Sequence, residues 1–153
     1  MFPHPIRDPD GHRLGETDDV PVDGNDVASV TATHHWAEDL FNFGYYWEAH
    51  EAWEGIWHAF GRRGTKATFV KALIKLAAAG VKAREGNTAG VQRHARRASE
   101  LFRLAAEDIG HGASLLGLDP IRLAAESDKL MTAPANIVNT DAKPVLRVMP
   151  FVL

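Results

Sequence analysis

Residues 45–60, with the sequence YYWEAHEAWEGIWHAF, repeat apolar side chains at the spacing of an amphipathic α-helix. A turn of about 100° per residue brings one set of side chains onto a single arc: Tyr46, Ala49, His50, Trp53, Ile56, Trp57 and Phe60. The opposite arc carries Glu48, Ala52, Gly55 and Ala59. The stretch therefore predicts a helix that buries an aromatic face and ends near Gly61.

The helical period continues on both sides of this stretch. All eight prolines lie at or before Pro21 or at or after Pro120, so the region between them is free to form continuous helices. We expect a first helix that starts within residues 29–33, a third over residues 66–85, a fourth over 88–109 and a fifth over 120–130. Thr65 is the expected N-cap of the third helix, which is apolar almost all round and should be central. The predicted class is all-α, a compact bundle of about five helices.

Three parts of the chain differ in composition. Residues 1–28 hold seven acids and two bases, with Pro and Gly throughout, and predict an extended acidic arm. Residues 29–131 form the expected helical bundle domain. Residues 132–153 are an apolar, proline-containing tail, which we expect to be extended and to pack on the bundle or on a second subunit. Self-association, as a dimer, is therefore the expected assembly.

Composition excludes several classes of protein. The 153 residues are 45% hydrophobic and 24% charged, which is typical of one globular domain, and they include no cysteine. Disulfide frameworks, thiolate zinc sites and thiol nucleophiles are thus excluded, and nothing in the sequence requires a cofactor. No signal peptide or membrane span is evident, so we expect a cytoplasmic protein that does not act in a membrane.

His50 and Glu54 lie four residues apart in the aromatic helix. This spacing puts the two side chains within contact of each other on the predicted buried face. A buried carboxylate is costly without a partner, so we expect Glu54 to bond to His50, a cation or a metal, and otherwise to have a raised pKa. Glu51 lies at the edge of the face, and Glu48 is expected to point to solvent.

The favoured interpretation of this cluster is a structural network, because buried polar groups in bundles usually tie helices together. The candidate partners of His50 and Glu54 on neighbouring helices are Lys71, Lys75, Arg84 and His94. The residues expected in the network, or in a small pocket, are Tyr46, Trp47, Glu48, Trp53, Trp57, Lys75 and His94. This interpretation predicts a noncatalytic interaction or structural module.

Two catalytic alternatives stay open. His50 and Glu54 are candidate ligands of a divalent metal, although the sequence lacks the second histidine of the His-Glu-x-x-His zinc pattern. His50, Glu51 and Glu54 are also candidate catalytic residues of a small-molecule hydrolase, acting as general acid and base with or without metal. The adjacent pair His34 and His35 is a weaker candidate, because neighbouring residues on a helix point about 100° apart.

Nucleic-acid binding is disfavoured. The basic side chains that raise the question are Arg62, Arg63, Lys66, Arg93, Arg96, Arg97 and Arg103. They lack interleaved aromatic residues, and the chain as a whole has a net charge of −3. Solvated arginines on an exposed helix face explain this pattern.

The aromatic motif resembles a known family. The motif is Phe43-Gly44-x-Tyr46-Trp47-Glu48-x-His50-Glu51-x-Trp53-Glu54-x-x-Trp57, followed by residues 72–79, ALIKLAAA, and by Gly86-Asn87 and Gly90. It is similar to the domain-of-unknown-function family 309, over about residues 35–107. The resemblance implies a compact helical bundle, and it implies no activity, substrate or cofactor, since none is established for the family.

Overall fold

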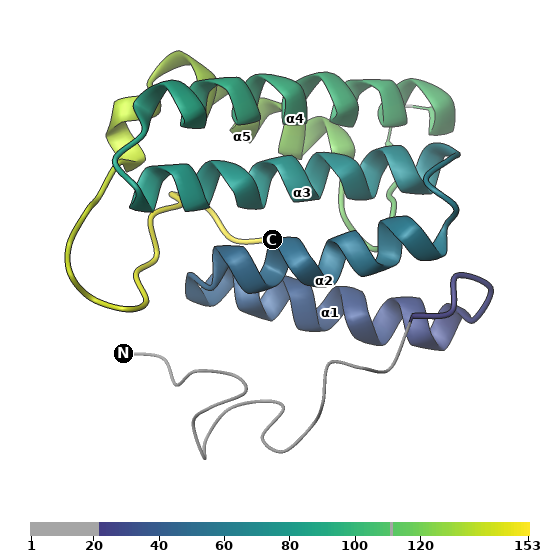
Figure 1. The fold of residues 1–153 in the computed structure, drawn as a ribbon. Helices are drawn as coiled ribbons and strands as arrows, with labels where there is room; N and C mark the ends of the chain where they lie inside the picture. The colour runs from purple at the N-terminus through teal and green to yellow at the C-terminus, as the bar shows by residue number, and fades with distance from the viewer. Residues whose placement is uncertain (1–21, 111) are drawn as a thin grey trace.

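The computed structural model describes residues 22–110 and 112–153. Their α-helices are α1 (Val27–Phe43), α2 (Tyr46–Ala59), α3 (Thr65–Arg84), α4 (Thr88–Ile109) and α5 (Pro120–Thr132), followed by a 3₁₀ turn, η1 (Pro134–Ile137). Each helix packs against the one that precedes it in the chain, and α5 lies behind α4 in the view of Figure 1. The described residues contain no β-strand. The prediction of an all-α bundle of about five helices is confirmed.

Two helices start one or two residues earlier than predicted. Helix α1 begins at Val27, before residues 29–33, because the Asp26 side chain accepts a hydrogen bond from the Ala28 N–H (3.0 Å) and caps the helix. Helix α3 begins at Thr65 itself, with Gly64 at the cap position. The Thr65 hydroxyl donates instead to Asp108 of α4 (3.0 Å), so this side chain joins two helices.

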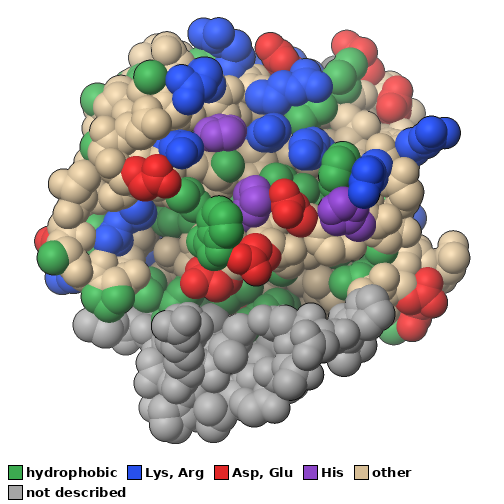
Figure 2. Space-filling view, viewed as in Figure 1, with side chains coloured by type: hydrophobic (Ala, Val, Ile, Leu, Met, Phe, Trp, Pro, Cys, Tyr) green, Lys and Arg blue, Asp and Glu red, His purple; other side chains and the backbone are tan. Residues whose placement is uncertain are grey.

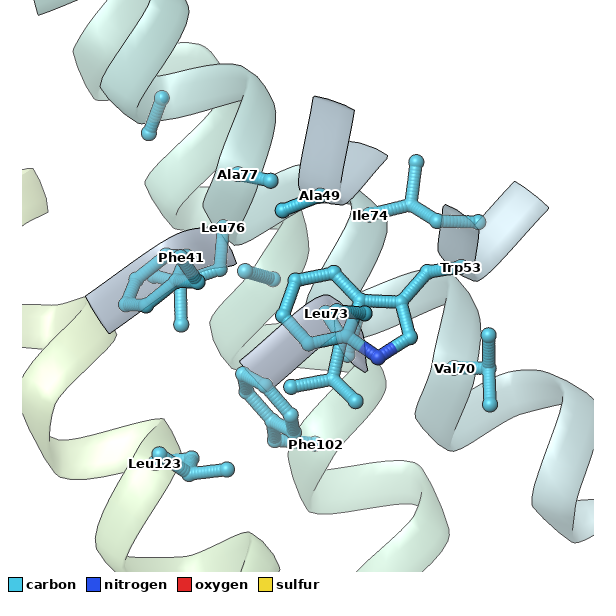
Figure 3. Close-up of a cluster of buried hydrophobic side chains, with 14 of the residues drawn as sticks. Phe41, Ala49, Trp53, Val70, Leu73, Ile74, Leu76, Ala77, Phe102 and Leu123 are labelled. Carbon is cyan, nitrogen blue, oxygen red and sulfur yellow. The ribbon is translucent and has the colours of Figure 1, made fainter. Parts of the chain in front are cut away.

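Helix α3 forms the centre of the bundle. It contacts both α2 and α4, and its side chains are buried on almost every side. Figure 3 shows Leu73 and Leu76 of α3 among aromatic rings from other helices. Trp53 of α2, Phe41 of α1 and Phe102 of α4 are fully buried there. Between its two ends, α3 is polar along the row of Lys71, Lys75 and Lys82, as the sequence predicts.

The C-terminal tail lies on its own bundle. The Tyr46 hydroxyl accepts hydrogen bonds from the N–H groups of Val148 (2.9 Å) and Met149 (3.1 Å). Asn42 pairs with the backbone of Leu153 through its side-chain amide (2.8 Å from Leu153 N). The tail also crosses Gly44, where a Cβ atom would lie 2.8 Å from the Leu146 oxygen. The apolar tail is therefore covered, at least in part, by the chain's own helices.

Most of the acidic arm expected over residues 1–28 lies outside the described residues. Residues 27 and 28 already belong to α1, so the helices begin slightly before residue 29, and α5 ends at Thr132. None of the described helices is both long and apolar enough to cross a lipid bilayer.

Candidate functional site

The motif residues of α2 lie on two faces of the helix, one buried in the core and one partly exposed to solvent. Trp53 is fully buried against α1 and α3, together with Ala49 and Ile56. One residue further, a turn of about 100° takes Glu54 off this face, and its side chain is 41% exposed. The expectation that Glu54 is buried is therefore wrong.

The outer edge of α2 carries a stacked aromatic pair beside the Glu54 carboxylate. The Trp47 indole is 56% exposed and stacks on the His50 imidazole, with ring centres 5.4 Å apart and planes 12° from parallel. His50 Nε2 lies 3.5 Å from Glu54 Oε1, and the His50 side chain is 19% exposed. Contact between His50 and Glu54 agrees with the sequence prediction, but the pair lies at the surface instead of in a sealed core.

Lysines of α3 and a histidine of α4 border this edge. We name the set His50, Glu54, Lys71, Lys75 and His94 the polar face. Figure 2 shows Lys and Arg side chains crowded over α3 and α4, with His side chains and acidic side chains nearer α2. Lys71 and Lys75 are half-buried, and within the described residues neither forms an ion pair with a carboxylate. No direct ion pair within this part of the chain therefore neutralises the two lysines, although the Glu54 carboxylate favours the charged form of Lys71.

Burial and the neighbouring charges shift the pKa values of the two histidines of the polar face. Burial lowers the pKa of His50, and Lys71 and Lys75 lower it further, although Glu54 and Glu51 act in the opposite direction. Burial also lowers the pKa of His94, with smaller contributions from Lys75, Lys82, Arg93 and His50. Because both values lie below that of a free histidine, both imidazoles are neutral at pH 7. The positive charge of the face then resides on its lysines.

Acid is expected to destabilise the fold through these two histidines. In the unfolded chain each histidine binds a proton at its ordinary pKa of about 6.5. In the folded chain the same histidines bind a proton only at a lower pH, because their pKa values are lowered. The unfolded state therefore holds more protons just below this pH, and the free energy of unfolding falls as the pH falls. Thermal melts from pH 7.5 to 5 should show this decrease, and it should be smaller in the double variant H50Q/H94Q. An equal decrease in both proteins would contradict the assignment.

Trp57 provides a further contact at the end of this face. The Lys71 ammonium lies 4.2 Å from the centre of the Trp57 ring, a cation–π geometry, and the Arg62 guanidinium lies 5.6 Å from the same ring. Burial, with the charge of Lys75, lowers the pKa of Lys71. The aromatic ring therefore holds Lys71 in place without neutralising it.

A second His–Glu pair, on α1, is the one that is buried. His34 is 1% exposed, and its Nδ1 accepts a hydrogen bond from the Trp53 indole N–H (3.1 Å). Its other ring nitrogen, Nε2, contacts Glu38 Oε1, four residues along the same helix. This is the structural tie expected of His50 and Glu54. The same i, i+4 spacing marks both pairs in the sequence, but spacing alone does not say which pair faces the core.

Tyr46, Trp47 and Glu48 line a different feature, a cavity of about 390 Å³ between α2, α3 and the tail. Glu48 is half-buried there, so the expectation that it points freely to solvent is wrong. His50, Glu54, Lys75 and His94 do not line this cavity, and Trp53 is sealed in the core. The predicted network residues are thus divided among three places. Arg84, a candidate partner of His50, contacts the tail instead, at Asp141 O and Lys143 O.

Part of the basic surface is neutralised by its neighbours. Arg103 of α4 pairs with Asp128 of α5 (2.5 Å), which lowers the pKa of that carboxyl, and Arg97 pairs with Glu100 (3.0 Å).

Among the described residues, no three His, Asp or Glu side chains are grouped so that they could hold a metal ion. The described part of the chain therefore offers two metal-ligand candidates, His50 and Glu54, without a third.

A family of known sequences matches the helices that carry the polar face. Residues 32–94 match the sequence model of a domain of unknown function, DUF309. Over these residues the chain is similar to the DUF309 family, as the aromatic motif predicts. The match spans α2, α3 and parts of α1 and α4, so His50, Glu54, Lys71, Lys75 and His94 all lie within the DUF309 region. No curated protein and no solved structure matches the chain significantly.

Proposed function

We propose that this protein is a noncatalytic binding module whose polar face binds an acidic segment of a partner protein. The observation that carries the proposal is the pair of half-buried cations on the central helix, Lys71 and Lys75, which form no ion pair within the described residues. Partly desolvated charges without an internal partner gain more from an external anion than fully solvated ones do. A carboxylate of the partner would supply that charge.

The surroundings of the two lysines support a protein partner. Trp47 offers an exposed, flat apolar ring directly beside the face, and aromatic side chains of this kind are enriched at protein interfaces. Glu51 and Glu54 form an acidic border on α2, which would repel a partner shifted toward that side. Trp47 and Glu54 are 56% and 41% exposed to solvent, and this favours recognition over a reaction that requires exclusion of water.

Charge-neutralising substitutions test the proposal. A fluorescein-labelled hexaglutamate peptide serves as the probe, and its binding is followed by fluorescence anisotropy at low salt. We expect the double variant K71Q/K75Q to weaken binding by tenfold or more, and added salt to weaken binding to the wild type. The matched control is K129Q, which removes one positive charge from an exposed position on α5.

Binding by the wild type and by K129Q, with loss in K71Q/K75Q, would support the polar face as the site. Equal binding by all three proteins would refute Lys71 and Lys75 as the site. A loss that depends only on the number of positive charges removed would mean that net charge alone attracts the peptide. Absence of binding to the wild type would refute recognition of an acidic segment.

A hydrolase that uses His50, Glu51 and Glu54 is the second candidate, with or without a divalent metal. One observation favours it: a His50 imidazole that is neutral at pH 7 lies 3.5 Å from Glu54, as a general base and its orienting carboxylate would. The metal content of untagged protein, measured by plasma mass spectrometry with E54Q as the reference, tests the metal form. Stoichiometric metal that is absent from E54Q would favour this candidate over the binding module.

We also propose that the chain self-associates, as a dimer in the cytoplasm. Val152 of the tail is 46% exposed, Ile121 of α5 is exposed as well, and Arg122 donates to the Val152 carbonyl (2.6 Å), so the two apolar side chains belong to neighbouring segments. Sedimentation of the variant I121D/V152D should give a lower mass than the wild type. The same mass for both proteins would refute this contact.

A further inference from the structure

The cavity beneath the tail has walls from two distant parts of the chain. Tyr46 and Trp47 of α2 and Val81 of α3 form the bundle side, and Pro144 and Val145 form the tail side. Its volume of about 390 Å³ lies in the range of small-molecule sites. The walls named so far are aromatic or aliphatic, so they suit a flat or branched apolar group.

Arg84 is the cation in the cavity wall. Its Nη2 donates to the carbonyl oxygens of Asp141 (2.9 Å) and Lys143 (2.6 Å) and so holds the start of the tail. Its Nε is buried and has no hydrogen-bond acceptor among the residues that the structure describes. Within that part of the chain, Arg84 also forms no ion pair with a carboxylate. A buried charged donor without an acceptor is costly, so an acceptor from outside the described chain would be stabilising.

We propose that this cavity binds a small organic monocarboxylate with an aromatic or branched apolar body. The ligand carboxylate accepts a hydrogen bond from Arg84 Nε, and the apolar body lies between Trp47, Val81 and Val145. An oxyanion is the natural partner of a guanidinium, and a charge-assisted bond is stronger than one to a neutral acceptor.

Two acidic side chains narrow the class of ligand. Glu48 and Glu85 also line the cavity, and Glu85 is paired with Lys82 (3.2 Å). A second carboxylate on the ligand would meet these charges and be repelled. The site is therefore expected to prefer monocarboxylates to dicarboxylates of similar size.

Binding at this site would connect the tail to the bundle. The ligand would contact Arg84, which already holds the tail backbone, as well as the tail side chains Pro144 and Val145. A ligand that binds only the folded arrangement stabilises it. Saturating ligand should thus slow hydrogen exchange of the Val148 and Met149 amides, which bond to Tyr46.

Phenylacetate is the probe, and its uncharged amide, phenylacetamide, is the matched ligand control. Binding to the full chain is followed by Trp fluorescence and by two-dimensional NMR. We expect phenylacetate to bind at least tenfold more tightly than phenylacetamide and than phenylmalonate, its dicarboxylate analogue. Equal affinity for the acid and the amide, or no binding of the acid, would overturn the proposal.

Arg84→Lys is the decisive variant, because lysine keeps the positive charge and removes the Nε–H donor. The matched control is Arg122→Lys, since Arg122 also holds the tail through its Nη2 but lies outside the cavity. We expect R84K to lose at least tenfold in phenylacetate affinity and R122K to keep the wild-type value. Equal affinities in R84K and the wild type would exclude Arg84 as the carboxylate partner.

A second variant covers the case in which R84K fails to fold. Val145→Phe fills the cavity from the tail side and leaves Arg84 in place, so it should abolish phenylacetate binding. Unchanged binding in V145F would place the ligand elsewhere and overturn the proposal. The variant K71Q/K75Q should bind phenylacetate like the wild type, so the cavity and the polar face are tested separately.

Discussion

Replacement of His34 by alanine is expected to lower the free energy of unfolding by about 3 kcal/mol. The substitution leaves the Trp53 indole N–H without its acceptor in a fully buried position and leaves the Glu38 carboxylate without its contact. It also opens a cavity between α1 and α2. Urea unfolding followed by Trp fluorescence measures the loss, since the transition of a domain of this size is normally two-state.

His50 provides the matched control for this prediction. His50 also lies four residues before a glutamate, but its side chain is 19% exposed and Glu54 is 41% exposed. Because solvent screens this pair, H50A should cost about 1 kcal/mol or less. His34→Asn should be milder than H34A, because an Asn side-chain oxygen can accept the indole N–H. Similar losses in H34A and H50A would mean that the buried tie on α1 has no special role.

Replacement of Gly80 by alanine is the second substitution with a large expected effect. A Cβ atom at this position would lie 2.5 Å from Cγ of the Tyr46 ring, far inside van der Waals contact. The ring cannot easily move away, because its hydroxyl holds the tail through Val148 and Met149. We expect G80A to cost about 1–3 kcal/mol and to loosen the tail, as overpacking of a core does.

Gly55 is the control for Gly80, since both glycines lie inside helices. Among the residues that the structure describes, a Cβ atom at Gly55 would meet only Val22 Cγ2, at 3.8 Å, which is an ordinary contact. G55A should therefore stabilise the protein by about 0.5–1 kcal/mol, because alanine favours the helix. Thermal melts of the two variants should shift in opposite directions. A stabilising G80A would contradict the close packing of Tyr46 on α3.

The helices and much of the core could be predicted from the sequence, because helical periodicity is a local property of the chain. The aromatic arc of α2 correctly identifies Trp53 as buried, and the almost uniformly apolar α3 is central. Periodicity cannot, however, separate the centre of a buried face from its edge. Glu54 was expected inside and lies at that edge, next to Lys71.

The composition of the candidate site depends on contacts that the sequence does not contain. His50, Lys75 and His94 come from three helices, and their proximity follows from the rotation of each helix about its axis. The link between Tyr46 and the tail spans more than one hundred residues, and no local pattern reports it. The tie between His34 and Trp53 was missed for the same reason, although the His-x-x-x-Glu spacing of α1 was visible.

The central claim is that an anion bound at the polar face compensates Lys71 and Lys75 beside His50 and His94. The most direct test is an NMR titration of the two imidazoles, assigned through H50Q and H94Q, with and without saturating hexaglutamate peptide. A bound anion favours the protonated imidazole, so the account predicts that the peptide raises the pKa of both His50 and His94. Unaltered pKa values at His50 and His94 in the presence of bound peptide would contradict it.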